Sequence, residues 1–232
     1  MDIYRRRRIV IALISLLTIV FTIIQNSPIQ STSIAPAGEK VSNTGSLLAV
    51  DALKTLDING RAPKTDYSRE KYGNGWNIVT GCDMRNIILN RDLDKAVVDN
   101  KCNVTSGVLN DPYTGKIINF TRGGGTSGAV QIDHVVALSD AWQKGAQLLT
   151  LDKRIKLAND PLELLAVDGG ANLEKSDSDA ASWLPPNKLF RCQYVARQIA
   201  VKQKYSLWIT DAEHSIMSTV LSNCEQQILP TP

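Results

Sequence analysis

The sequence lacks the cysteine spacing of a metal site, since its four cysteines include no C-x-x-C pair. None of them follows the apolar N-terminal run closely enough to suggest lipid attachment. An even number of cysteines, all beyond that run, is typical of disulfides formed in an oxidising compartment. Four cysteines allow three pairings, and we favour Cys82–Cys102 and Cys192–Cys224 because each closes a short local loop.

The chain also lacks an excess of basic residues beyond its N-terminus. Of its 26 basic and 23 acidic side chains, four arginines and Asp2 lie in residues 1–37, so residues 38–232 hold 22 of each sign. Proteins that bind nucleic acid tightly and without specificity usually carry a basic excess. The balance of charges counts against tight, non-specific binding of nucleic acid, but it is compatible with a locally basic cleft.

No internal repeat is present, and the composition shows no bias towards disorder. Hydrophobic residues make up 43% and charged residues 21% of the 232 positions, which is close to the globular average. A chain of this length forms one sizeable domain or two small ones.

The N-terminus differs from the remainder. Residues "MDIYRRRR" are followed by an apolar run of 16 residues, 9–24. Such a run is typical of a signal peptide or a short membrane anchor, and the arginines favour export of everything that follows. Small residues at Ala35 and Ala37 offer a cleavage site, so cleavage and retention both stay open.

These features predict three parts. Residues 1–24 form a signal peptide or an N-terminal membrane anchor, residues 25–45 a polar linker, and residues 46–232 the folded domain. The domain is therefore expected to be extracellular, or attached to the outer face of the cytoplasmic membrane.

Hydrophobic periodicity in the domain predicts an α+β fold with a few short strands and most of its mass in helices. Two strands are expected around a turn at Asp111–Pro112, closed by Gly115. A helix is expected to begin near Asn172, and the last helix to begin with Thr210 and Glu213 as a capping-box pair and to run to about Cys224.

Histidine is scarce, yet one of the two histidines ends an apolar run. In "VQIDHVVALSDAW" the run stops at Asp133 and His134. Adjacent strand residues point to opposite faces, so both can serve one site only where a strand bends or ends. A second apolar run, "LELLAV", precedes a Gly-Gly pair and then Asn172.

This ordered set resembles the HNH endonucleases of the ββα-metal type. It is most similar to secreted bacterial proteins related to the C-terminal nuclease domain of GmrSD-type restriction enzymes. The resemblance runs from about Tyr67 to Cys224 and includes "GCDMRNIILNRDL", "DPYTGKIINF", "QIDHVVALSDAWQKGA", "NDPLELLAVDG" and "WLPPN". It implies a ββα-metal core at about residues 128–187, embedded in a mainly helical domain.

The resemblance also implies roles for three residues. His134 matches the general base that activates water, while Asp133 and Asn172 match the ligands of one divalent cation, Mg²⁺ or Mn²⁺. Lys175, one helical turn after Asn172, is expected to contact a phosphate oxygen. The alternatives without a catalytic or binding role are a core histidine, a strand-ending aspartate, a helix-capping asparagine and a solvated lysine.

One position departs from the resembled pattern. Glu163 stands where the family usually carries an asparagine that braces the catalytic loop. A glutamate donates such a hydrogen bond only when it is protonated, although it can accept one from a backbone amide. This substitution puts full activity in doubt, rather than the fold.

Three functions follow from these observations. The first is an exported, metal-dependent endonuclease that hydrolyses DNA, or RNA, with nucleic acid as partner and the membrane as a second partner if the N-terminal segment is retained. The second is a weakened module of the same fold that binds nucleic acid or an envelope component. The third is a phosphodiesterase acting on another polymer. The sequence leaves the oligomeric state open.

Overall fold

The computed structural model describes residues 47–231. The predicted signal peptide or anchor and the linker lie outside these residues. No helix between residues 47 and 231 combines the length and the apolarity needed to cross a membrane.

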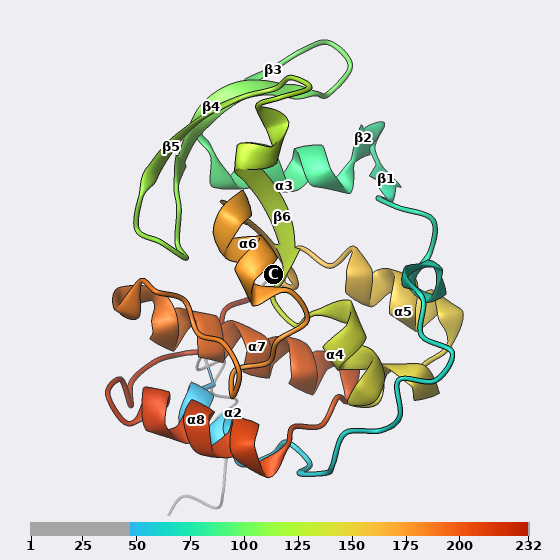
Figure 1. The fold of residues 1–232 in the computed structure, drawn as a ribbon, viewed down its shortest axis with the longest axis vertical. Helices are drawn as coiled ribbons and strands as arrows, with labels where there is room; N and C mark the ends of the chain where they lie inside the picture. Colours follow the sequence, from blue (N-terminus) through green and yellow to red (C-terminus); the bar gives the residue numbers. More distant parts are fainter. Residues whose placement is uncertain (1–46, 232) are drawn as a thin grey trace, which may run out of the picture. The chain divides into compact units, whose positions relative to one another are not determined.

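Helices and short antiparallel strands alternate along the domain (Figure 1). The helices are α2 (Ala49–Leu53), α3 (Met84–Asp92), α4 (Leu138–Gln143), α5 (Leu151–Ala158), α6 (Gly169–Lys175), α7 (Arg191–Tyr205) and α8 (Asp211–Leu221). The 3₁₀ turns are η1 (Arg69–Tyr72), η2 (Ser127–Ala129), η3 (Ala146–Leu148) and η4 (Lys188–Phe190). The strands are β1 (Ile78–Val79), β2 (Cys82–Asp83), β3 (Asp94–Val98), β4 (Val104–Asn110), β5 (Ile117–Thr121), β6 (Val130–His134) and β7 (Leu164–Asp168). The expected α+β class is confirmed.

The strands form three separate antiparallel sheets, β1-β2, β3-β4-β5 and β6-β7. The predicted hairpin is present as β4 and β5, and Gly115 in its connection has a φ of +74°. In the third sheet Val130 pairs with Asp168 and His134 pairs with Leu164. Helix α6 follows β7 directly, so the polypeptide forms a strand pair and then a helix.

The β6-β7 pair lies between two hydrophobic cores. Leu164 and Ala166 pack with the core that contains α3 and the three-stranded sheet, whereas Leu165 and Val167 pack with the core of α2, α7 and α8. Figure 1 shows β6 and α6 between these two regions. A strand buried on both faces needs apolar residues at every position, which explains the continuous run "LLAV".

Helix α6 begins three residues earlier than the sequence predicted. Asp168 is the N-cap and accepts a hydrogen bond from the backbone N–H of Ala171 at 2.8 Å, so Asn172 lies inside the helix and does not cap it. A Cβ on Gly169 would lie 2.0 Å from the carbonyl oxygen of Gly128. Glycine is needed there for a close backbone approach, and the Gly-Gly pair opens the helix.

The capping box predicted at the start of α8 is only partly present. The Thr210 hydroxyl accepts from the backbone N–H of Glu213, but the Glu213 carboxylate is bound to two buried lysines and does not return to the cap. The helix also ends at Leu221 instead of Cys224.

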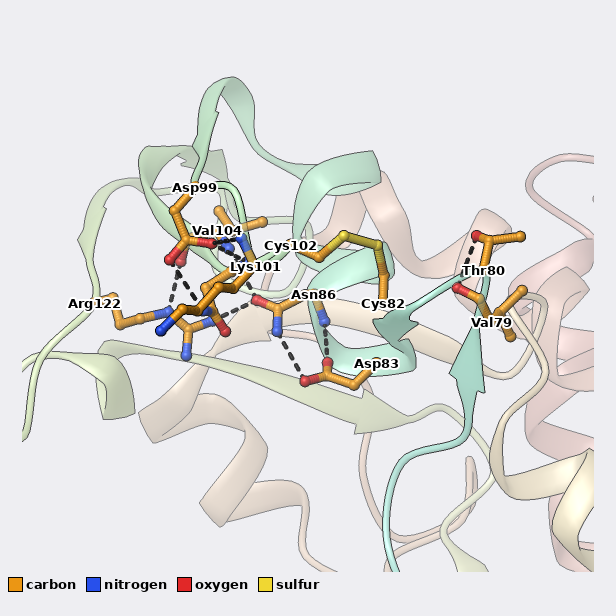
Figure 2. Close-up of a disulfide and its surroundings, with 11 residues drawn as sticks. Val79, Thr80, Cys82, Asp83, Asn86, Asp99, Lys101, Cys102, Val104 and Arg122 are labelled. Atoms are coloured by element: carbon orange, nitrogen blue, oxygen red, sulfur yellow. Dashed lines mark hydrogen bonds between the residues drawn. A yellow bond between two sulfur atoms is a disulfide. The ribbon is translucent and has the colours of Figure 1, made fainter.

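Both favoured disulfides are present, Cys82–Cys102 and Cys192–Cys224. The first joins β2 to the segment before β4 (Figure 2). Beside it, buried Asn86 accepts from the backbone N–H of Val104 at 2.9 Å and donates to Asp83. Asn86 therefore fixes α3 against β4, a structural role that the sequence did not reveal.

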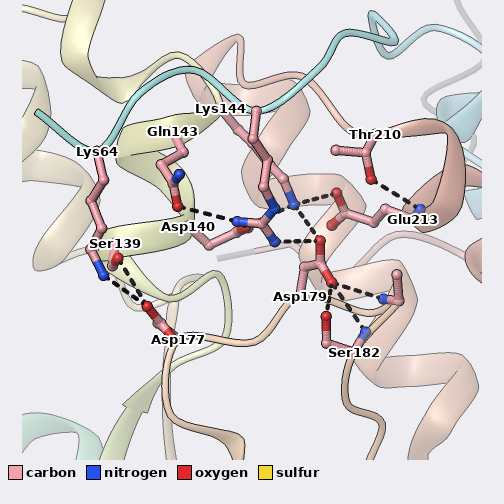
Figure 3. Close-up of polar contacts among 12 residues, drawn as sticks. Lys64, Ser139, Asp140, Gln143, Lys144, Asp177, Asp179, Ser182, Thr210 and Glu213 are labelled. Atoms are coloured by element: carbon pink, nitrogen blue, oxygen red, sulfur yellow. Dashed lines mark hydrogen bonds and ion pairs between the residues drawn. The ribbon is translucent and has the colours of Figure 1, made fainter.

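A buried cluster of charges connects the helices. Lys144, with no exposed side-chain surface, lies 2.7 Å from Asp140, 2.8 Å from Asp179 and 2.7 Å from Glu213 (Figure 3). Lys202 approaches Glu213 at 2.9 Å. Burial opposes the charge of Lys144, but the three carboxylates more than offset it and raise the pKa of Lys144. We refer to these five residues as the buried charge cluster.

Substitution of Lys144 tests this cluster. Lys144→Met would leave the three buried carboxylates with Lys202 and the partly exposed Arg61 as cationic partners, and we expect a loss of about 3–5 kcal/mol in the free energy of unfolding. Lys156→Met is the matched control, since Lys156 and its partner Asp152 are largely exposed and the expected change is below about 1 kcal/mol. Urea denaturation measures both, and equal losses would contradict a structural role of the cluster.

Candidate functional site

Two adjoining cavities lie at the C-terminal end of β6. The larger has a volume of about 510 Å³ and the smaller of about 150 Å³. Arg69, His134 and Leu138 line both of them. The larger cavity is also lined by Asp133 and Asn172, so the structure brings three of the four predicted site residues to one place.

His134 ends β6 and is held by two contacts. Its Nε2 lies 3.0 Å from the carbonyl oxygen of Ala158, and its ring stacks on Trp76 at 5.8 Å with an interplanar angle of 6°. Because a carbonyl oxygen can only accept, Nε2 carries the proton and Nδ1 is left as an acceptor. Burial lowers the pKa of His134 to about 3, so the imidazole is neutral in the folded protein.

Asp133 is a buried carboxylate with two strong donors. The ammonium of Lys175 lies 2.9 Å from Oδ1, and the hydroxyl of Tyr113 donates to Oδ2 at 2.5 Å. Burial raises the pKa of Asp133, and the charge of Lys175 opposes that effect. Lys175 also donates to the carbonyl oxygen of His134 at 2.9 Å, so one side chain of α6 fixes the end of β6.

Lys175 does not lie where the sequence analysis placed it. Its side chain has no exposed surface and its ammonium is bound to Asp133 and His134, so it faces the interior and not a phosphate. The alternative of a solvated surface lysine is equally wrong. The helix begins at Gly169, and this register turns Lys175 inward. Lys175 therefore acts on the site by positioning Asp133.

Asn172 lies on the cavity side of α6. Its amide Nδ2 donates to Oε1 of Gln131 at 2.8 Å, which fixes the side-chain rotation and leaves Oδ1 as an acceptor at the cavity. The predicted amide ligand thus has its oxygen available.

The cavity offers few donor groups for a metal ion. Within residues 47–231, no group of three or more His, Cys, Asp or Glu side chains could hold one. Asp133 and Asn172 supply two oxygen types that suit a hard cation, and each Asp133 oxygen keeps a further lone pair. They fit a single cation that takes its other ligands from water and phosphate, a usual arrangement for Mg²⁺. The metal assignment stays a prediction.

Glu163 lies beneath the segment that follows His134. Its side chain has no exposed surface, and Oε2 accepts from the backbone N–H of Val136 at 3.1 Å, as the sequence analysis allowed. Its Oε1 has no hydrogen-bond partner among the described residues. Burial raises the pKa of Glu163 well above its ordinary value.

Several cavity residues were not identified from the sequence. Lys64, Tyr67 and Arg69 line the larger cavity, Trp76 supports His134, and Tyr113 binds Asp133. The first four lie in "KTDYSREKYGNGW", a polar stretch with several aromatic residues and no periodicity. That aromatic content is the one signal that could have indicated them, since their proximity to His134 depends on long-range folding.

Comparison with known proteins gives two matches. The sequence profile described as GmrSD restriction endonucleases, C-terminal domain, matches residues 82–220. A protein named "Uncharacterized secreted protein" from Arthroderma benhamiae is 36% identical over 179 residues, which cover 76% of this chain and 84% of that protein. This relative is fungal, so the resemblance is not confined to bacterial proteins. No solved structure matches the chain.

The raised pKa of Glu163 has a measurable consequence. As pH rises above the ordinary carboxyl pKa, the unfolded chain releases the proton while the folded protein keeps it, so this residue lowers stability with rising pH. We expect Glu163→Gln to gain stability over wild type progressively between pH 4.5 and pH 8. Urea unfolding at several pH values measures the difference.

Glu174→Gln is the matched control, because Glu174 is exposed on α6. Its stability difference from wild type should stay nearly flat over the same range. If Glu163→Gln instead lost stability relative to wild type as the pH rose, Glu163 would be ionised in the folded protein.

Proposed function

This chain belongs to the family of C-terminal domains of GmrSD restriction endonucleases, and from this premise we propose that it is an exported, metal-dependent endonuclease. Its substrate would be DNA, or RNA, and its core would be of the HNH type. One observation carries the proposal most directly: a neutral histidine, locked in one tautomer, lines the same cavity as a buried carboxylate and an oriented amide oxygen.

The proposed reaction is attack of water on a phosphodiester. Nδ1 of His134 would take the proton of the attacking water as the new P–O bond forms and the bond from phosphorus to the 3′ oxygen breaks. The Ala158 carbonyl keeps the ring oriented and would stabilise the imidazolium through Nε2–H. The negative phosphate would raise the pKa of His134 in the complex and make it a stronger base than in the free protein.

The other residues would hold the reacting groups in place. Lys175 and Tyr113 keep the Asp133 carboxylate in one orientation, and Gln131 does the same for Asn172. A divalent cation bound by Asp133 and Asn172 would supply stabilisation of the charge that grows on the phosphate and the leaving oxygen. Preorganisation of this kind favours catalysis because no reorientation is needed during reaction.

The placement of Glu163 favours an enzyme over an inactive binding module. Glu163 accepts from the backbone N–H of Val136 and braces the segment after His134. Burial raises the pKa of Glu163, which disfavours a second negative charge near the proposed metal ligands. The loop support that the usual asparagine would give is thereby replaced. No comparable observation favours a phosphodiesterase acting on another polymer.

An extracellular location is part of the proposal. The relative from Arthroderma benhamiae is named as a secreted protein, and two disulfides are present in this domain. Disulfides persist in oxidising compartments. A nuclease there would meet nucleic acid released from other cells.

A plasmid-nicking assay tests the function. With Mg²⁺ or Mn²⁺ we expect relaxation of supercoiled plasmid, and with EDTA we expect none. His134→Ala should lower the rate by about 10²–10⁴-fold, the usual contribution of a general base. His214→Ala is the matched control, because it removes the only other histidine, which lies on α8 away from both cavities.

Equal activity of the His134→Ala and His214→Ala proteins would exclude His134 as the base. If a folded wild-type protein with both disulfides intact cleaves neither DNA nor RNA with any of these metals, the endonuclease proposal is wrong.

A further inference from the structure

Residues 61–69 form one wall of the larger cavity without belonging to a helix or strand until Arg69 begins η1. We call this segment the basic strap. Backbone contacts hold it to α4: the N–H of Ala62 donates to the carbonyl oxygen of Gln143 at 2.9 Å, and Nε1 of Trp142 donates to the carbonyl oxygen of Thr65 at 3.2 Å. The strap is therefore placed by defined hydrogen bonds.

The buried charge cluster fixes one end of the strap. The guanidinium of Arg61 lies 2.9 Å from Asp140 and 2.7 Å from Asp179. Both carboxylates are almost fully buried, so Arg61 is held by groups that cannot move away. The path of the strap past His134 thus depends on the same ion pairs that connect the helices.

Lys64, Tyr67 and Arg69 lie along the cavity wall. The ring of Tyr67 packs against Trp142 at a centroid distance of 6.1 Å. The ammonium of Lys64 is 3.0 Å from Asp177, which also accepts from Ser139 at 3.2 Å, as Figure 3 shows. The Lys64–Asp177 pair is about half exposed on both sides.

The charges around the larger cavity balance except at one residue. Four of its lining residues are charged: Lys64, Arg69, Asp133 and Asp177. Lys64 is paired with Asp177, and Asp133 is paired with buried Lys175. Among residues 47–231, Arg69 makes no ion pair or side-chain hydrogen bond, and its side chain is exposed. One uncompensated positive charge therefore faces the cavity beside His134.

Other arginines of the domain contrast with Arg69. The guanidinium groups of Arg91, Arg122, Arg154 and Arg191 all donate to backbone carbonyl oxygens. A guanidinium offers a planar fork of donors that matches two oxygens of a phosphate. The donors of Arg69 remain available at the junction of the two cavities that His134 lines.

We propose that the basic strap is the substrate-binding wall of this cleft and that Arg69 contacts the phosphate attacked beside His134. Tyr67 would pack against the adjacent sugar or base, since its ring lines the same wall and aromatic rings stack on nucleotides. When the substrate binds, Lys64 would leave the Asp177 carboxylate and bind the neighbouring phosphate. The inference rests on the proposed function, because it assigns the anionic substrate of that same site.

The first test measures binding without catalysis. A 5′-fluorescein single-stranded DNA oligonucleotide is titrated in EDTA with wild-type protein, Arg69→Ala and Lys71→Ala, and fluorescence anisotropy gives Kd at several salt concentrations. Lys71 is the matched control because it is an exposed cation of the same 3₁₀ turn that lines neither cavity. We expect Arg69→Ala to weaken binding about tenfold and to lower the salt slope by about one. Lys71→Ala should stay within about twofold.

The second test measures cleavage by the same proteins with metal present. Arg69→Ala should lose about 10²–10³-fold in kcat/KM, with part of the loss in kcat, as expected for a donor aimed at charge that develops in the transition state. Arg69→Lys keeps the charge without the fork and should recover part of this loss. Thermal unfolding of Arg69→Ala should match wild type, because Arg69 supports no other group among the described residues.

The outcomes separate the two proposals. If wild type binds the oligonucleotide through Arg69 but does not cleave, the strap assignment stands and the endonuclease proposal fails. If wild type cleaves and Arg69→Ala resembles Lys71→Ala in both binding and cleavage, the strap assignment is overturned. A folded wild-type protein that does not bind the oligonucleotide overturns it as well.

Discussion

The buried ion pair between Asp133 and Lys175 is the contact on which the site depends. It joins the end of β6 to the last turn of α6, and the second bond of Lys175, to the His134 carbonyl oxygen, fixes the backbone at His134. Two charges removed from water are stable only when both are paired and further hydrogen bonds satisfy them. Tyr113 supplies that further bond to Asp133. The position of α6, and with it Asn172, follows from this requirement.

The buried charge cluster and the cleft are parts of one arrangement. Asp140 and Asp179 bind Lys144 on one side and Arg61 on the other, so the ion pairs that hold the helices together also place the strap beside His134. A cluster of this kind contributes little net stability compared with apolar packing, but its ion pairs hold Arg61 and the helices in one relative geometry. That geometry defines where the wall of the cleft lies.

Much of this structure follows from the sequence, and the failures have physical reasons. The β4-β5 hairpin, both disulfides and the strand that ends at His134 depend on local patterns and were predicted. Lys175 was misplaced because the helix was expected to begin near Asn172, whereas Asp168 caps it and Gly169 allows the approach of the Gly128 carbonyl. Arg69 could not be predicted, since 65 residues separate it from His134 and only the folded chain brings them to one cavity.

Net charge is a poor guide to the substrate of this domain. The balance of basic and acidic residues in residues 38–232 counted against non-specific binding of nucleic acid. In the cleft, however, the ammonium groups of Lys64 and Lys175 are paired with carboxylates, whereas the guanidinium of Arg69 is not. A single available guanidinium beside a neutral imidazole is enough to orient one phosphate, because a short-range, bidentate contact does not need a basic surface. Recognition of this kind would be local and directional, and it would allow an overall neutral protein to act on a polyanion without adhering to it along its length.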